Sequence, residues 1–364
     1  MKHSATTGIA AALALLASSN ISAQSVTVYG LIDTSVEYVT HANAAGASVV
    51  RMPSLTGSMP SRIGFRGIED LGGGLEAFFV LESGLLIDSG GLNQGNRMFG
   101  RASYVGMRGS WGSLTFGRQP NMSFYAYLKS DIMGPNLYSL SSVDSYLPNA
   151  RSDNAIGYLG KFGEVSAGAT YSFGRDASAA GGPAGTNCPG EVAGNAKACR
   201  QVTAMLAYDA LSGAYGATTA YDILYGGAGA AAGLNDSNYH DERFTVNGYF
   251  MLGKAKLGAG LIRRQTEALQ TTKSNLYFAG IKYAFSAPLE WDTQFVRLNI
   301  EHSPNGATLL ASRLTYFLSK RTAIYSMVGY MRNRGTSAIP LDAGGTIGAG
   351  MSQTGIAVGT RHTF

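Results

Sequence analysis

The sequence is poor in charged residues, in cysteine and in long apolar segments. Only 14% of its 364 residues are charged, and Lys and Arg form no basic run, so the net charge of +5 is no nucleic-acid signature. After the N-terminal region, no apolar run is long enough for a membrane-spanning helix. Yet 45% of the residues are hydrophobic, which is too many for a disordered chain. These absences exclude a helical membrane protein, a disordered chain and a basic nucleic-acid binder.

The N-terminal 23 residues have the pattern of a secretory signal peptide. Lys2 and His3 precede the apolar segment GIAAALALLA, and small residues follow up to Ala23. This apolar core is too short to span a bilayer and has the flanks of a cleavable export segment. The sequence therefore predicts a signal peptide over residues 1–23 and a single mature domain over residues 24–364.

The predicted export affects the expected oxidation state of the two cysteines, Cys188 and Cys199, which lie in a polar segment of the chain. In an oxidising compartment their spacing favours a disulfide that closes a surface loop. Two free thiols are the alternative. A metal site is disfavoured because no histidine lies nearby, and we expect neither a metal nor a cofactor.

A period of two dominates the chain after residue 24. The clearest alternation of apolar and polar residues occurs in SVTVYGLIDTSVEYV, EVSAGATYSF, QVTAMLAYD and ERFTVNGYFML. No helical stripe of comparable length competes with it, so the sequence predicts an all-β protein.

The connections between these segments alternate strictly between short and long. Short turns are predicted at residues 70–74, 110–113, 161–164, 210–214, 251–255, 285–289 and 318–321. Longer polar segments are predicted at about 40–60, 86–98, 120–150, 174–200, 224–241, 266–274, 302–307 and 333–353. Seven turns and eight loops join sixteen strands, and one end with turns and one with loops is typical of an up-and-down antiparallel barrel.

The size of such a barrel determines whether its lumen or its outer surface contacts water. Sixteen strands enclose more space than side chains can fill, so the lumen holds water and the polar face of each strand points inward. The apolar face then meets lipid, which a closed sheet allows because every backbone group is paired. Tyrosines at strand ends suit the aromatic girdles of a transmembrane barrel, and the candidates are Tyr29, Tyr38, Tyr104, Tyr158, Tyr208, Tyr221 and Tyr330.

Closure also explains why the alternation runs to the last residue. We expect Ile356 and Val358 to face lipid, Arg361 to face the lumen, and Phe364 to lie beside Ser25 and Val26 of the first strand.

The longest connection, residues 120–150, has no clear period and is rich in aromatic residues. A loop of this length is usually functional, and its composition suits a segment packed inside the lumen. Its charged residues are Asp131, Asp144 and Lys129.

Arginines on neighbouring strands have the parity to face this loop. Arg62 and Arg66 alternate with Ile63 and Phe65, which we expect to face lipid. Three further arginines are candidates. Arg101 has the parity opposite to that of Ala102 and Tyr104, and Arg151 is the first residue of a strand. Arg118 shares the parity of Leu114 and Phe116, so it needs a bend in the strand to point inward. The alternative is that each arginine only lines the lumen or snorkels to a lipid head group.

The segments SVTVYGLIDTSVEYV, SRIGFRGIEDLGGGLEAFFVLESGL and NRMFGRASYVGMRGSWGSLTFGRQ, with the ending RHTF, resemble the general-diffusion porins of Gram-negative outer membranes. The similarity covers nearly the whole mature chain and is greatest to the beta-proteobacterial and neisserial-type branch. It implies a homotrimer of sixteen-stranded barrels, a third loop folded into each lumen, and passive flux of small hydrophilic solutes and ions. It also implies outer-membrane lipid and lipopolysaccharide around the barrel, and a terminal Phe364 recognised by the assembly machinery.

The same resemblance implies a basic wall facing the third loop, which selects Arg62, Arg101 and Arg151 first and Arg66 and Arg118 second. The loop lacks the Pro-Glu-Phe-Gly pattern of enterobacterial porins, so its acidic partners, Asp131 and Asp144, are less firmly indicated. Several arginines against one or two aspartates predict a mild anion preference.

Three other functions are weighed against a diffusion channel. A channel with a saturable site for small anions, such as phosphate or organic acids, would use the same arginines. A barrel with a purely structural or adhesive role would conduct little. An outer-membrane enzyme is disfavoured, because the mature histidines, His41, His240, His302 and His362, are scattered and no nucleophile motif accompanies them.

Overall fold

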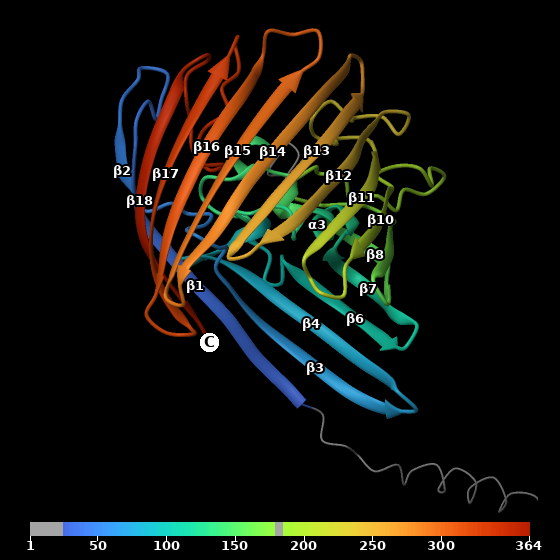
Figure 1. Ribbon diagram of the computed structural model, residues 1–364. Coiled ribbons are helices and arrows are strands. Elements are labelled where there is room, and N and C mark those ends of the chain that lie inside the picture. The colour runs from blue at the N-terminus through green and yellow to red at the C-terminus, as the bar shows by residue number, and fades with distance from the viewer. Residues whose placement is uncertain (1–24, 179–184) are drawn as a thin grey trace, which may run out of the picture.

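The computed structural model describes residues 25–178 and 185–364, so the predicted signal peptide lies outside the described part. Its strands join in one sheet of eighteen, of which β2 (Val49–Arg51) and β5 (Gly91–Leu92) are short pieces within connections. The other sixteen form a closed antiparallel barrel, as predicted (Figure 1).

The bounds of the sixteen barrel strands are β1 Ser25–Val39, β3 Arg62–Gly72, β4 Leu75–Leu86, β6 Ala102–Gly109, β7 Gly112–Pro120, β8 Arg151–Phe162, β9 Val165–Ser172, β10 Gln201–Asp209, β11 Tyr215–Tyr225, β12 His240–Leu252, β13 Ala255–Glu267, β14 Thr271–Ser286, β15 Leu289–Ile300, β16 Gly306–Phe317, β17 Thr322–Arg334 and β18 Ser352–Thr363. The helical segments are α2 Asn93–Asn96, α3 Met122–Tyr127, α4 Leu140–Val143 and the 3-10 turn η1 Leu147–Asn149. In the part of the chain that the structure describes, none of these helices is long and apolar enough to cross a membrane.

Pairing of the first and last strands closes the barrel. Strand β18 runs antiparallel to β1 from Val39↔Gly355 to Leu31↔Thr363. Beyond this ladder the amides of Gly30 and Phe364 exchange two hydrogen bonds of 3.1 Å. Phe364 therefore lies beside Gly30 rather than beside Ser25 and Val26, because β1 begins before β18 ends and its first residues pair only with β3. This start of β1 extends below the C-terminus in Figure 1.

The two faces of the strands differ in chemistry as the alternation predicts. On β1, the outward side chains of Val26, Val28 and Val36 are more than half exposed, whereas the inward Asp33 and Glu37 are at most 2% exposed. The last strand follows the same rule, with Ile356 and Val358 outward and Ala357 buried. An exposed apolar face on every side of a closed sheet is what a lipid-embedded barrel requires.

The aromatic girdles are only partly as predicted. Tyr38, Tyr208, Tyr221 and Tyr330 lie outward and exposed. Tyr29 and Tyr104 face the lumen instead. The Tyr29 hydroxyl donates to Glu82 (3.0 Å), and Tyr104 lies on the same face of its strand as Ala102, which is paired with Glu82. The expectation that Ala102 and Tyr104 face lipid is therefore wrong.

Several of the connections at the loop end are shorter than predicted, most of all the one between β13 and β14. Strands β13 and β14 are joined by residues 268–270, and β15 and β16 by residues 301–305. Their strands extend into segments that sequence polarity assigned to loops, because paired polar residues above the lipid boundary still form regular ladders.

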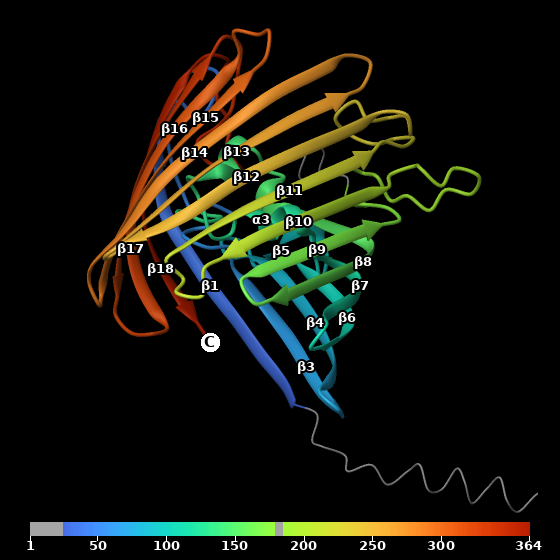
Figure 2. The ribbon, with the colours of Figure 1, turned by 45° about the vertical axis from the view of Figure 1, so that its right-hand side comes forward.

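The longest connection, residues 121–150, folds into the barrel, where α3 is visible inside the ring of strands in Figures 1 and 2.

A substitution at the closing pair tests how tightly the barrel ends are fitted. A Cβ at Gly30 would lie 2.2 Å from the Phe364 ring and 2.8 Å from the Arg62 carbonyl oxygen. We expect Gly30→Val to destabilise the barrel by about 1–3 kcal/mol through overpacking. The measurement is denaturant unfolding of detergent-refolded protein. Ala259→Val, at an exposed outward position of β13, is the control and should stay within about 0.5 kcal/mol of the unsubstituted protein. Equal stability of the two variants would contradict the fit.

Candidate functional site: the channel constriction

Residues 121–150, called the third loop from here on, lie against one wall of the barrel. Buried loop side chains, among them Tyr127, Leu137 and Leu140, join one apolar cluster with inward side chains of the wall. The wall contributes Ile262, Leu276, Phe278, Val296, Leu309, Met327 and Met331. On β13–β17 the inward face is therefore partly apolar, contrary to the prediction of a uniformly polar lumen. The physical reason is that the third loop, and not water, covers this wall.

The other end of the loop is fixed by polar contacts centred on Asp222 of β11. One carboxylate oxygen accepts hydrogen bonds from Ser123 (2.7 Å) and Tyr146, and the other accepts one from the Gln201 amide (2.8 Å). Two guanidinium groups contact the Tyr146 ring, with the guanidinium carbon of Arg243 at 4.3 Å and that of Arg175 at 4.9 Å from its centroid. Burial raises the pKa of the Tyr146 phenol, so it stays protonated and remains a donor.

A third attachment involves the extracellular loops. The Tyr138 hydroxyl donates to Glu37 (2.9 Å), and Arg51 bridges Glu37 (2.8 Å) and Asp342 (2.9 Å). These contacts join the third loop to residues 40–61 and 335–351, and so fix it from the extracellular end of the barrel.

The arginines that line the opposite wall share carboxylates. Arg101 lies 2.6 Å from Glu82 and Arg62 lies 3.7 Å from it. Arg101 precedes β6, so its side chain reaches the lumen although its strand parity is outward. Arg66 is exposed, and its guanidinium carbon lies 5.6 Å from the centroid of the Tyr29 ring.

Arg118 lies beside a bulge in the neighbouring strand. The pairing of β7 with β8 goes from Gly117↔Ala155 to Gln119↔Ser152, so the extra residue is in β8 and places Asp153 near Arg118, while β7 pairs regularly with β6 up to Ser103↔Arg118. Arg118 then lies 2.5 Å from Asp153, while Arg97 lies 3.3 Å from Asp153 and 2.8 Å from Asp176. Arg97, in the connection between β4 and β6, was missed by the sequence reasoning, since no period assigns a direction to a loop residue.

Arg151 has a different position from the other arginines. It is 2% exposed and donates to the carbonyl oxygens of Arg101 (2.9 Å) and Pro148 (2.8 Å). Its guanidinium carbon lies 5.5 Å from the centroid of the Phe124 ring. It therefore supports the base of the third loop and the turn that carries Arg101, and does not face the water.

A cavity of about 400 Å³ separates the arginine wall from the third loop. On one side it is lined by Arg97, Arg101 and Arg118, together with Asp176, the partner of Arg97. On the other side the loop contributes only neutral residues, which are Pro135, Ser141, Ser145, Pro148 and Asn149. This arrangement is a narrow gap with cations on one wall and hydroxyl and amide groups on the other.

The charged residues of the third loop do not lie across this gap. Asp131 is 8% exposed, and burial raises the pKa of its carboxyl group to about 6. Asp144 lies 3.4 Å from Arg243 and lines a separate cavity of about 510 Å³. Lys129 pairs with Asp209 (2.5 Å), beside the turn that follows β10. The prediction that Asp131 and Asp144 face the arginines across the pore is therefore wrong, since both carboxylates lie elsewhere in the loop packing.

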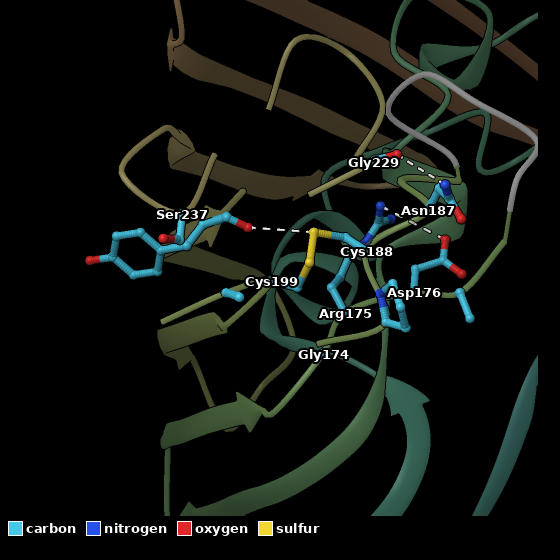
Figure 3. The surroundings of a disulfide bond; sticks show 12 residues. Gly174, Arg175, Asp176, Asn187, Cys188, Cys199, Gly229 and Ser237 are labelled. Atoms are coloured by element: carbon cyan, nitrogen blue, oxygen red, sulfur yellow. Dashed lines mark hydrogen bonds and ion pairs between the residues drawn. A yellow bond between two sulfur atoms is a disulfide. The ribbon is translucent and has the colours of Figure 1, made fainter. Parts of the chain in front are cut away.

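A disulfide joins Cys188 and Cys199 in the connection between β9 and β10 (Figure 3). The backbone of Asp176 pairs with Cys188, and the amide of Arg175 donates to the Cys199 carbonyl oxygen (3.2 Å). The covalent link thus holds the segment that places Arg175 on Tyr146 and Asp176 on Arg97.

Comparisons with known proteins give the context for this geometry. The family model described as "Gram-negative porin" matches residues 6–336. Outer membrane porin protein 32 of Delftia acidovorans is 30% identical over 97% of this chain and 98% of its own length. Major outer membrane protein P.IB of Neisseria meningitidis is 39% identical over 95 residues, which are 26% of this chain and 28% of that protein. The solved anion-selective porin from Comamonas acidovorans superposes with a TM-score of 0.76 at 28% identity, covering 94% of this chain and 100% of that one.

Asp222 offers a direct test of the loop attachment. Asp222→Ala removes the acceptor of Ser123, Tyr146 and Gln201. The Ser123 and Tyr146 hydroxyls are then left as buried unpaired donors, each costing about 1–3 kcal/mol, whereas Gln201 keeps its bond to Tyr146 (2.9 Å). We expect amide hydrogen exchange in residues 121–150 to rise more than about tenfold. Asp236→Ala, in the exposed loop after β11, is the control. Unchanged exchange in the Asp222 variant would show that the apolar cluster alone holds the loop.

The buried Asp131 predicts a pH dependence of the same loop. Its folded-state pKa lies above the usual carboxyl value, so ionisation is disfavoured in the folded loop. The stabilising contribution is therefore fully present below about pH 4 and is lost as the pH rises through about 6. Exchange of residues 121–150, corrected for the intrinsic rate, should increase from pH 5 to pH 8. Asp131→Asn should remove most of this increase, and an equal increase in the variant would contradict the assignment.

Proposed function

Because this chain belongs to the Gram-negative porin family, whose members lie in the outer membrane, we propose that its constriction makes it an anion-preferring diffusion channel. Passive passage of small hydrophilic solutes through a water-filled barrel is the activity of the family, and the resemblance predicted from the sequence is confirmed. The finer proposal concerns the charge of the solutes that pass most readily.

One observation supports the anion preference most directly. Arg97, Arg101 and Arg118 line the narrow gap, and the facing surface of the third loop carries no carboxylate in the described chain. Cationic side chains around a narrow aqueous passage favour anions, and the preference weakens at high salt because the charges are screened. Glu82, Asp153 and Asp176 partly neutralise the same wall, so we expect selectivity rather than exclusion of cations.

The related structure from Comamonas acidovorans, which is described as anion-selective, supports the same proposal. The alternative, a channel with a saturable site for small anions such as phosphate or organic acids, is favoured by the size of the cavity. A volume of about 400 Å³ beside three arginines can hold a small anion in contact with more than one guanidinium group.

Several further properties belong to this proposal. The residues predicted for the site fall into three roles: Arg62, Arg66, Arg101 and Arg118 shape the field on the wall, Arg151 positions the loop, and Phe364 completes the closing pair. We propose a homotrimer, surrounded by outer-membrane lipid, with Phe364 as the signal for the assembly machinery and residues 1–23 as the cleaved signal peptide. A role as a channel and not as an enzyme accords with the porin relatives.

Ion selectivity in planar bilayers tests the proposal. In a KCl gradient, the reversal potential of the unsubstituted protein should have the sign of an anion-selective channel. In Arg97→Gln/Arg118→Gln, Asp153 loses both arginine partners and Asp176 keeps only Arg175 (3.9 Å), so we expect the chloride-to-potassium permeability ratio to fall at least about twofold. The double variant Arg263→Gln/Lys273→Gln removes the same charge from the outer face and should leave the ratio unchanged.

A cation-selective reversal potential in the unsubstituted protein would refute the anion preference while leaving the channel intact. Ser145→Asp places a carboxylate opposite the arginines and should shift the ratio toward potassium. Current that saturates with phosphate but not with chloride would favour the alternative of a selective binding site. Conductance steps that occur in threes would support the trimer.

A further inference from the structure

The outer surface of the barrel carries arginines that form no ion pair within the part of the chain that the structure describes. Arg297 of β15 and Arg332 and Arg334 of β17 lie on the face that points away from the lumen. Their direction follows from the register, because Phe295, Leu310 and Tyr330 are outward, exposed and paired across the same three strands. Each arginine lies toward the extracellular end of its strand.

The register brings the three arginines into one patch. Arg297 is paired with Thr308 of β16, and Thr308 is paired with Arg332. The next outward row contains Asn299, Gly306 and Arg334 in the same order. Adjacent strands lie about 4.8 Å apart, so the patch spans about 10 Å across β15–β17, which lie side by side in Figure 1.

Two of the guanidinium groups meet on one neutral oxygen. The Oδ1 atom of Asn299 accepts hydrogen bonds from Arg297 Nε (3.1 Å) and Arg334 Nη2 (2.8 Å). Gly306 permits this arrangement, because a Cβ there would lie 2.8 Å from Arg334 Nη2. The Arg334 side chain thus crosses the middle strand to reach Asn299.

The patch lacks the negative charge that would make this convergence favourable. Within residues 25–178 and 185–364, Arg297, Arg332 and Arg334 form no ion pair, and the buried Nε atom of Arg334 has no hydrogen-bond partner. The nearby Glu301 instead accepts from the Asn275 amide (3.0 Å). Two like charges held on one amide oxygen repel each other unless an anion joins them.

We propose that this patch, defined by Arg297, Asn299, Arg332 and Arg334, binds the phosphate group of an outer-leaflet lipid. A phosphate oxygen matches the planar fork of arginine and can accept charge-assisted hydrogen bonds from more than one guanidinium group. The patch lies one outward position above the apolar row of Phe295, Leu310 and Tyr330. A ligand there has its anionic head at the arginines and its hydrocarbon beside the apolar row, which a lipid satisfies and a free anion does not.

The test measures lipid retention by the detergent-refolded full-length mature protein with native mass spectrometry. The probes are lipid A that carries two phosphates and the same lipid after enzymatic removal of both. We expect the unsubstituted protein to prefer the phosphorylated probe, and Arg297→Gln/Arg334→Gln to bind it about tenfold or more weakly. The matched control is Arg263→Gln/Lys273→Gln, which removes two outward cations from β13 and β14 and should change the affinity less than about twofold.

Three results would overturn the proposal. These are equal retention of the two probes by the unsubstituted protein, equal weakening in both double variants, and displacement of the lipid by millimolar inorganic phosphate. Single-channel conductance should be the same in all variants, because the patch is outside the lumen, and this readout also reports correct folding.

If the glutamine variant fails to fold, Arg297→Lys/Arg334→Lys keeps the charge but loses the planar fork. It should then bind the phosphorylated probe with intermediate affinity, and unchanged affinity in it would refute recognition by the arginine fork.

Discussion

Backbone pairing between β1 and β18 is the constraint on which the rest of the structure depends. A sheet in lipid has no water to satisfy an open edge, so each N–H and C=O group must find a partner within the sheet. The ladder from Val39↔Gly355 to the Gly30–Phe364 pair provides this closure. Once the sheet is closed, its two faces meet different solvents. The parity of a residue then decides whether its side chain contacts lipid or the lumen.

The third loop modifies this rule on the inside. By packing on β13–β17, the loop replaces water with protein, and inward positions such as Phe278 and Leu309 become apolar. The carboxylates on and around the loop are used in attachment: Asp222 holds Ser123 and Tyr146, and Asp144 lies at Arg243. What faces the gap is therefore the neutral remainder of the loop. The charge balance of the constriction is thus a consequence of how the loop is held.

The period of two was sufficient to predict the strands and the inward direction of Arg62 and Arg66, and the alternation of short and long connections was sufficient to predict the barrel and the number of its strands. It could not predict features that depend on breaks in the ladder. Arg118 pairs with Asp153 where β8 carries an extra residue, and Arg97 lies in a connection, where alternation carries no information. The positions of Asp131 and Asp144 were not predictable either, because their partners are distant in sequence. Phe364 was misplaced by a few residues because strand stagger is not encoded in the alternation of either strand.

Parity also separates two uses of arginine in one barrel. Arg313 and Arg243 point inward, are nearly buried, and each has a carboxylate partner within 2.7 Å, namely Asp292 and Asp241. Burial makes such pairing necessary, since an unpaired charge away from water is costly. Arg297 and Arg334 lie on the opposite face and share only an amide oxygen. An arginine at the level of the lipid head groups can pair with an anion of the membrane, so the protein chain need not supply a carboxylate for it. Among the described residues, the outer arginines have no carboxylate partner and the inner arginines do, and the solvent that each face of the sheet meets explains both.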